Sequence, residues 1–254
     1  MSKTLQIQHK NGYALLQIDN GKVNAINTEL ARDLRDTFLD LEKNEAVGGI
    51  VLIGKPHCFS AGLDIMMMAS SDIDDIVEFW KVYMEALQAM VRYSKPFLCG
   101  ITGFAPAAGT CIALCADYRI MGKGDKHVIG LNEFKMSLVI PEMMGDIYAY
   151  HLGEKAAWEA IQSAALFGAE DAVKIGLVNE AIEVEEVVEK IEARMAKMMK
   201  PLPNTYATSK RLMRQELLRR VDRDIEAMLD GIRAHMEDPM TKKMFALFLS
   251  KLKK

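Results

Sequence analysis

The sequence predicts an α/β fold that is followed by a helical C-terminal region. Two short apolar runs, residues 49–53 and 96–101, each lead into a stretch of small residues. Apolar runs of this length, bounded by turn residues, are typical of buried strands. From about Glu142 onward, strand patterns nearly disappear and helical patterns dominate. This change predicts a mixed α/β core over residues 1–200 and a helical region over residues 201–254.

The other elements follow from local patterns. Residues 5–9 and 13–19 carry strand patterns, and Asn11-Gly12 between them predicts a β-hairpin. Asn27 or Thr28 is expected to cap the helix that follows. Strand, helix and strand in this order are typical of units that build a parallel sheet. The predicted helices cover residues 28–45, 77–93, 154–165, 169–174 and 184–199, with further helical runs from about 204 to the end, a weak strand pattern over 176–180 and a polar, mobile connection over 70–76.

The composition argues against several classes of function. The 254 residues carry a net charge of −3, which gives no electrostatic reason to expect a nucleic acid partner. The longest apolar runs are too short to cross a bilayer, and the first residues lack the apolar stretch of a signal peptide. The four cysteines include no Cys-x-x-Cys pair. We therefore expect reduced thiols, no metal site, no membrane partner and a cytoplasmic location.

The two small-residue stretches are the candidate functional site. Phe59-Ser-Ala-Gly-Leu-Asp64 follows the first strand, and Gly103-Phe-Ala-Pro-Ala-Ala-Gly109 follows the second. Small side chains let a ligand approach the main chain closely. Two such turns can bring two free N–H groups together, and two converging donors make an oxyanion hole. Either stretch alone could equally be an ordinary strand-to-helix turn.

Together with Cys115-Ala-Asp-Tyr-Arg119, these motifs resemble the crotonase superfamily, the enoyl-CoA hydratases and isomerases. Their order and spacing match from about Leu15 to the C-terminus. The resemblance implies a crotonase-like fold of repeated β-β-α units with a helical C-terminal region. It also implies an acyl-CoA thioester as substrate, with coenzyme A as part of that substrate and no separate cofactor. The expected assembly is a homotrimer or a dimer of trimers.

Glu133 is the candidate acid/base. It follows the apolar residues Val128 and Ile129 and lies between Leu131 and Phe134, so burial would raise the pKa of its carboxyl group. A carboxyl group that titrates near neutrality is a good general acid or base. The spacing alone favours a surface glutamate in a loop. The resemblance reverses this preference, because it implies that a glutamate at this point is catalytic in both hydratases and isomerases.

Cys111 occupies the position at which the resemblance implies the second catalytic glutamate of the hydratases. Adding water benefits from two carboxylates, whereas moving a double bond by a proton shuttle needs one base. The sequence therefore favours an isomerase that converts 3-enoyl-CoA to 2-trans-enoyl-CoA. Leu131-Asn-Glu133 also resembles the mitochondrial-type Δ3,Δ2-enoyl-CoA isomerases. Two alternatives stay open: a hydratase or other acyl-CoA lyase that uses Glu133 alone, and a non-catalytic acyl-CoA-binding relative.

The resemblance implies the remaining site residues as well. The main-chain N–H groups of Leu63 and Ala108 would form the oxyanion hole. Alanine at position 108 replaces the usual glycine, which would strain the turn if its φ were positive. The residues implied for binding the coenzyme A part are Lys22, Val23, Ala25, Ser60, Ala61, Gly62, Asp64, Ile65, Phe248 and Lys251.

Other polar residues have simpler interpretations. Glu142 follows Pro141 and is expected to start a helix, where the helix dipole favours a carboxylate. His57 is expected to be a turn histidine, because no catalytic partner is evident. Ser60 and Thr110 lack the Gly-x-Ser-x-Gly elbow and a positioned base, which argues against a serine hydrolase.

Overall fold

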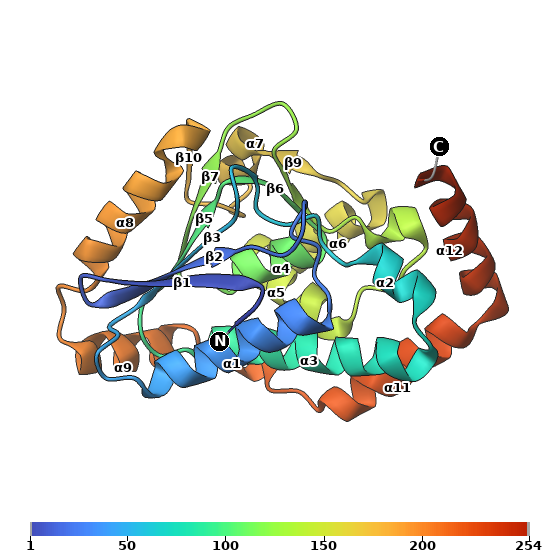
Figure 1. Cartoon of the computed structure of the whole chain (residues 1–254), viewed down its shortest axis with the longest axis horizontal. Helices are drawn as coiled ribbons and strands as arrows, with labels where there is room; N and C mark the ends of the chain where they lie inside the picture. Colours follow the sequence, from blue (N-terminus) through green and yellow to red (C-terminus); the bar gives the residue numbers. More distant parts are fainter. Residues whose placement is uncertain (1, 253–254) are drawn as a thin grey trace.

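The computed structural model describes residues 2–252, apart from the side chains of Phe248, Lys251 and Leu252. The strands are β1 (Leu5–Lys10), β2 (Tyr13–Ile18), β3 (Ile50–Ile53), β4 (His57–Cys58), β5 (Phe97–Ile101), β6 (Gly103–Pro106), β7 (Tyr118–Gly122), β8 (Val128–Gly130), β9 (Phe167–Gly168) and β10 (Glu180–Ile182). They form a six-stranded sheet in the order β1-β2-β3-β5-β7-β10 and a four-stranded sheet in the order β4-β6-β8-β9 (Figure 1). From β2 to β10 the larger sheet is parallel.

The helices surround these sheets. They are α1 (Thr28–Lys43), α2 (Ile65–Ser70), α3 (Ile73–Arg92), α4 (Ala108–Leu114), α5 (Glu142–Leu152), α6 (Glu154–Ser163), α7 (Ala169–Lys174), α8 (Val187–Met198), α9 (Pro203–Met213), α10 (Gln215–Val221), α11 (Ile225–Glu237) and α12 (Pro239–Leu252), with short 3-10 helices η1 (Glu133–Met136) and η2 (Val184–Glu186).

The chain repeats one unit three times. A strand of the larger sheet is followed by a strand of the smaller sheet and then by a helix: β3, β4 and α2; β5, β6 and α4; β7, β8 and η1. Because the second strands pair side by side, the segments that follow them begin at the same edge of the smaller sheet. This arrangement confirms the predicted α/β class, and it brings the two small-residue turns and Glu133 to one place.

Two helical layers cover the larger sheet. On one face, Leu15, Val51 and Leu98 pack against Val187 and Ile191 of α8. On the other face, the neighbouring strand residues belong to the main core, which α1, α3 and α4 complete. Figure 1 shows α8 on one side of the sheet and α1 with α3 on the other. Alternate residues of each strand therefore pack into two different cores, which explains why these strands are continuous apolar runs in the sequence.

Capping side chains set the helix starts near the site. The Asn27 side chain accepts a hydrogen bond from Leu30 N at 2.9 Å, so Asn27, one of the two expected candidates, caps α1. Asp64 caps α2, and Asp72 caps α3. The connection expected over residues 70–76 is therefore shorter than predicted, because α2 extends to Ser70 and α3 already begins at Ile73, where Asp72 accepts from a free N–H group of the first turn.

The helices after residue 200 pack on the core instead of forming a separate one. Leu217 and Val221 of α10 and Leu229 and Ile232 of α11 belong to the same hydrophobic cluster as α3. Figure 1 shows α11 running alongside α3. Within residues 2–252, no helix is both long and apolar enough to cross a membrane.

Candidate active site

A cavity of about 690 Å³ lies where four segments meet. Seven of the expected site residues line it: Lys22, Val23, Ala25, Ala61, Leu63, Asp64 and Ile65. The other lining residues are Asn20, Gly21, Asn27, Met66, Pro106, Ala107, Asn132 and Met136. The fold thus joins the loop before α1, the turn before α2, the turn before α4 and the start of η1. Ser60, Gly62, Ala108 and Glu133 lie beside this lining and are not part of it.

Asn24 and Ser60 fix the first turn. Asn24 is fully buried with a φ of 50°, and its Nδ2 donates to Ile18 O at 3.0 Å and to Phe59 O at 3.1 Å. Ser60 Oγ donates to Asn24 O at 2.7 Å and accepts from Gly62 N at 3.1 Å. Ser60 therefore supports the turn from behind. The sequence reasoning missed Asn24, although asparagine tolerates a positive φ in loops.

The second turn carries an unusual backbone conformation at Ala107. Its φ is 55° and its ψ is −128°, whereas Ala108 is the first residue of α4 and has no positive φ. The strain considered for Ala108 therefore falls one residue earlier. The two turns touch, because a Cβ placed on Gly62 would lie 3.0 Å from Ala107 Cβ and 3.7 Å from Ala108 N. Such strained positions are concentrated at ligand-binding sites.

The two expected oxyanion donors are available. In the described part of the chain, neither Leu63 N nor Ala108 N donates to a protein acceptor. Ala108 lies in the first turn of α4, where a main-chain N–H has no acceptor within the helix. The neighbouring N–H of Asp64, by contrast, donates to Ile26 O at 3.0 Å. Each turn therefore presents one main-chain donor that a ligand could use.

Glu133 is a buried carboxyl group without a partner. Its relative exposure is 0 %, and neither carboxylate oxygen has a hydrogen-bond partner among residues 2–252. Burial raises the pKa of Glu133 to about 7, although nearby main-chain N–H groups offset part of this rise. Leu131 is buried beside it. The expectation that Phe134 desolvates it is wrong, because Phe134 is 43 % exposed and packs edge-on against Trp158.

Three buried side chains lie close enough to Glu133 for its charge to affect them. Burial raises the pKa of Tyr83, Cys111 and Tyr148, and the nearby Glu133 charge adds to each shift. Cys111 is thus close to the catalytic candidate, but as a protonated thiol. The side-chain oxygens of Tyr148 and Asn132 are buried and lack partners in the described structure. Sequence reasoning missed both residues. Asn132 could have been indicated by its position beside Glu133, whereas no sequence signal indicated Tyr148.

The other candidates lie outside this site. His57 Nδ1 is 3.4 Å from His127 Nε2, and neither histidine lines the cavity. Glu142 starts α5 as expected and pairs with Arg223 at 2.7 Å. The side chains of Phe248 and Lys251 lie outside the described residues. Across residues 2–252, no three His, Cys, Asp or Glu side chains are grouped as metal ligands, and all four cysteines are free and buried.

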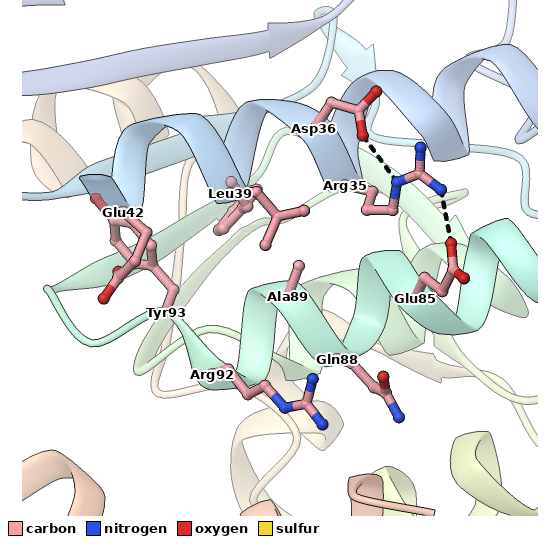
Figure 2. A pocket seen from close by; sticks show the side chains of 10 residues that line it. Arg35, Asp36, Leu39, Glu42, Glu85, Gln88, Ala89, Arg92 and Tyr93 are labelled. Carbon is pink, nitrogen blue, oxygen red and sulfur yellow. Dashed lines mark hydrogen bonds and ion pairs between the residues drawn. The ribbon is translucent and has the colours of Figure 1, made fainter. Parts of the chain in front are cut away.

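A second cavity of about 460 Å³ lies between α1 and α3. Figure 2 shows Arg35 at this cavity paired with Asp36 and with Glu85. Arg92, also at its edge, pairs with Asp222. None of the expected site residues lines this cavity, and its arginines already have carboxylate partners. The first cavity is therefore the candidate active site.

Comparison with known proteins shows which family this chain resembles. The family model described as enoyl-CoA hydratase/isomerase matches residues 8–254. A mitochondrial enoyl-CoA delta isomerase 1 of Rattus norvegicus is 30% identical over 243 residues, which are 95% of this chain and 84% of the relative. A probable enoyl-CoA hydratase of Mycobacterium tuberculosis is 27% identical over 202 residues, 78% of this chain and 76% of the relative.

The fold is also found among solved structures. The crystal structure of human mitochondrial delta3-delta2-enoyl-CoA isomerase superposes with a TM-score of 0.93 at 25% sequence identity. The superposition covers 99% of this chain and 98% of that chain. This likeness confirms the expected fold of repeated β-β-α units with a helical C-terminal region.

Proposed function

Because this chain belongs to the enoyl-CoA hydratase/isomerase family, we propose that it is an isomerase that converts 3-enoyl-CoA to 2-trans-enoyl-CoA. One observation carries the choice of reaction: Glu133 is a buried carboxyl group with a pKa of about 7, and the nearby position at which the hydratases would carry a second glutamate holds the thiol of Cys111. A proton shuttle needs one base that can both accept and donate near neutral pH. The relative and the solved structure that are named as isomerases support the same choice.

The proposed reaction moves one proton. The thioester oxygen accepts hydrogen bonds from the N–H groups of Leu63 and Ala108. Glu133 removes a proton from C2, and the electron pair moves into a dienolate that these two donors stabilise. Glu133 then returns the proton to C4, and the double bond lies between C2 and C3. No water is consumed and no electron leaves the substrate, so the step needs no separate cofactor.

The cavity supplies the surface for the coenzyme A part. Lys22 is exposed at its edge and makes no ion pair with another residue of the described chain, so its charge is available to a phosphate. Val23, Ala25, Ala61 and Ile65 provide apolar walls. Ser60 and Gly62 act from behind by holding the turn, and Asp64 caps α2 while it lines the cavity. Phe248 and Lys251 are also proposed to bind the coenzyme A part.

The assembly and the compartment also belong to this proposal. Large apolar side chains are exposed on α9 and α12: Leu212, Met213, Met240, Met244 and Leu247. Apolar side chains that stay exposed on helices are found at subunit interfaces, which supports a homotrimer or a dimer of trimers. Light scattering on the purified protein measures this state. The expected cytoplasmic location stays a prediction.

A substrate screen tests the reaction. The protein is incubated with 2- and 3-enoyl-CoAs of several chain lengths, and the conjugated thioester and the hydrated product are measured separately. We expect a 3-enoyl-CoA to yield the conjugated thioester with little hydration. Hydration of a 2-enoyl-CoA at a comparable rate would favour a hydratase, the activity for which the mycobacterial relative is named. Tight acyl-CoA binding without turnover of any substrate would indicate a non-catalytic relative.

A further inference from the structure

We propose that Thr110 is a positioning residue that fixes Glu133 relative to the oxyanion donor of Ala108. The inference rests on the proposed function and adds to it a residue that the mechanism has not used. Thr110 is fully buried in the first turn of α4. Its Oγ1 donates to Ala105 O at 2.7 Å, with Gly130 O as a second acceptor at 3.0 Å, and it accepts from Gly130 N at 2.8 Å.

These contacts join two separate parts of the site. Ala105 lies in β6, which leads into the turn with Ala108, and Gly130 ends β8, three residues before Glu133. Gly130 O also accepts from Ala107 N at 2.8 Å. Both main-chain polar groups of Gly130 are therefore held by the turn that carries the oxyanion donor. A shift of Gly130 would change the separation between that donor and the base.

Gly130 itself has little freedom to move or to change. Its φ is 145°, a conformation that favours glycine, and a Cβ at this position would lie 2.5 Å from Ala165 O. The Ala108 peptide is held on its other side, because Tyr83 OH donates to Ala108 O at 2.7 Å. Thr110 is the only side chain in the described structure with a hydrogen bond to Gly130. It therefore links the segment that carries Glu133 to the segment that carries Ala108, each of which is held by other contacts on its far side.

Thr102 provides a matched control for a purely structural role. It is also buried, at 4 % exposure, and its Oγ1 donates to Lys55 O at 2.8 Å. That bond joins the end of β5 to the loop before β4 and touches neither Gly130 nor Glu133. Valine has nearly the shape of threonine without the hydroxyl group. Thr110→Val and Thr102→Val therefore each remove one buried hydroxyl group. Thr102→Val loses a single donated bond, whereas Thr110→Val loses its donated bond and the bond accepted from Gly130 N, and with them the link to the base.

The kinetic test compares Thr110→Val, Thr110→Ser and Thr102→Val on a 3-enoyl-CoA substrate. We expect Thr110→Val to lower kcat by roughly ten- to a hundredfold with KM within about twofold, because a small displacement of a base affects the reacting geometry more than ground-state binding. Thr110→Ser keeps the hydroxyl group and should restore most of kcat. Thr102→Val should keep kcat within about threefold. Equal losses of kcat in the two valine variants, or no rescue by serine, would overturn the proposal.

A second measurement does not depend on turnover. In the ligand-free protein, Thr110→Val removes the acceptor of the Gly130 N–H, so its hydrogen exchange should accelerate at least tenfold and the NMR titration midpoint of Glu133 should move. In Thr102→Val neither should change. If wild type turns over no enoyl-CoA but these changes occur, the proposed reaction fails and the coupling stands. If wild type is active but the changes are absent, the coupling fails and the reaction stands.

Discussion

Lys210 Nζ lies 2.7 Å from Asp117 Oδ2, and both side chains are almost fully buried. This pair joins α9 to the loop that precedes β7. Arg214 Nη1 contacts the other oxygen of Asp117 at 2.5 Å, and Tyr206 OH and Phe97 N also donate to this carboxylate. One aspartate thus receives four donors, three of them from α9 and the residue that follows it, and anchors the start of the C-terminal helices to the core.

Replacing Asp117 by alanine should destabilise the protein strongly. The variant leaves the charges of Lys210 and Arg214 buried without their partner, which typically costs about 3–5 kcal/mol of unfolding free energy. Asp222→Ala is the control, because its pair with Arg92 is half exposed and should contribute within roughly 1 kcal/mol. Urea unfolding measures both. Similar losses in the two variants would show that the Asp117 cluster is not an anchor.

Glu133→Gln should abolish isomerisation and leave acyl-CoA binding nearly unchanged. Glutamine keeps the size of the side chain but cannot accept the proton from C2, so we expect a loss of at least about 10³-fold in kcat. Glu142→Gln is the control, because that carboxylate is 59 % exposed and pairs with Arg223. Steady-state kinetics and calorimetric binding provide the two readouts. Near-wild-type turnover by Glu133→Gln would exclude it as the base.

The rate of the wild-type enzyme should depend on the ionisation of Glu133. With a pKa of about 7, the carboxyl group is largely protonated at pH 6 and largely ionised at pH 8. Since the reaction begins with the carboxylate, kcat/KM should rise about tenfold for each pH unit well below 7 and level off above it. A profile that is already flat above pH 5 would contradict this pKa.

The same pKa fixes the sign of a stability effect. Burial raises the pKa of Glu133 from 4.5 to about 7, so the folded protein binds this proton more tightly than the unfolded chain. The contribution of this protonated carboxyl group to the unfolding free energy is fully present below about pH 4.5 and is lost as the pH rises through about 7. The total loss is on the order of 3 kcal/mol. Between pH 5 and pH 8, wild type should therefore lose stability relative to Glu133→Gln. The measurement is the unfolding free energy of both proteins at each pH, and an identical dependence on pH in the two would refute this linkage.

Ala107→Gly should stabilise the protein. Alanine at a φ of 55° and a ψ of −128° is strained, whereas glycine adopts this conformation readily. After the greater chain entropy of glycine is subtracted, we expect a gain of roughly 1 kcal/mol in unfolding free energy. Ala156→Gly, at an exposed position inside α6, should instead lose about 1 kcal/mol. Two losses of the same size would mean that Ala107 carries no strain.

Cys111→Ala should leave catalysis intact. The thiol is fully buried with Sγ 4.0 Å from Met144 O, and burial raises its pKa well above the usual value, so no thiolate forms near neutral pH. We expect kcat within about threefold of wild type and a stability loss of about 1 kcal/mol from the small cavity. Cys99→Ala is the buried control away from the base. A much larger loss of kcat at position 111 than at position 99 would assign Cys111 a role in the reaction.

Short-range patterns were sufficient for most of the fold. The hairpin at Asn11-Gly12, the Asn27 cap of α1 and the alternation of strand and helix all depend on residues within about a turn of one another, and each prediction was correct. The two small-residue turns and Glu133 became site candidates in another way. Local patterns alone fitted ordinary turns equally well and favoured a surface glutamate, and the order and spacing shared with the crotonase superfamily made them candidates.

The arrangement that makes these parts a site depends on contacts between distant segments. Thr110 meets Gly130 across twenty residues, and Ser60 meets Asn24 across thirty-six. The positive φ falls at Ala107 and not at Ala108, and Phe134 turns outward while Glu133 is buried. Neighbouring residues could not indicate these outcomes. Packing between distant segments, and not local preference, decides which residue of a turn takes the positive φ and which side of a short helix is buried.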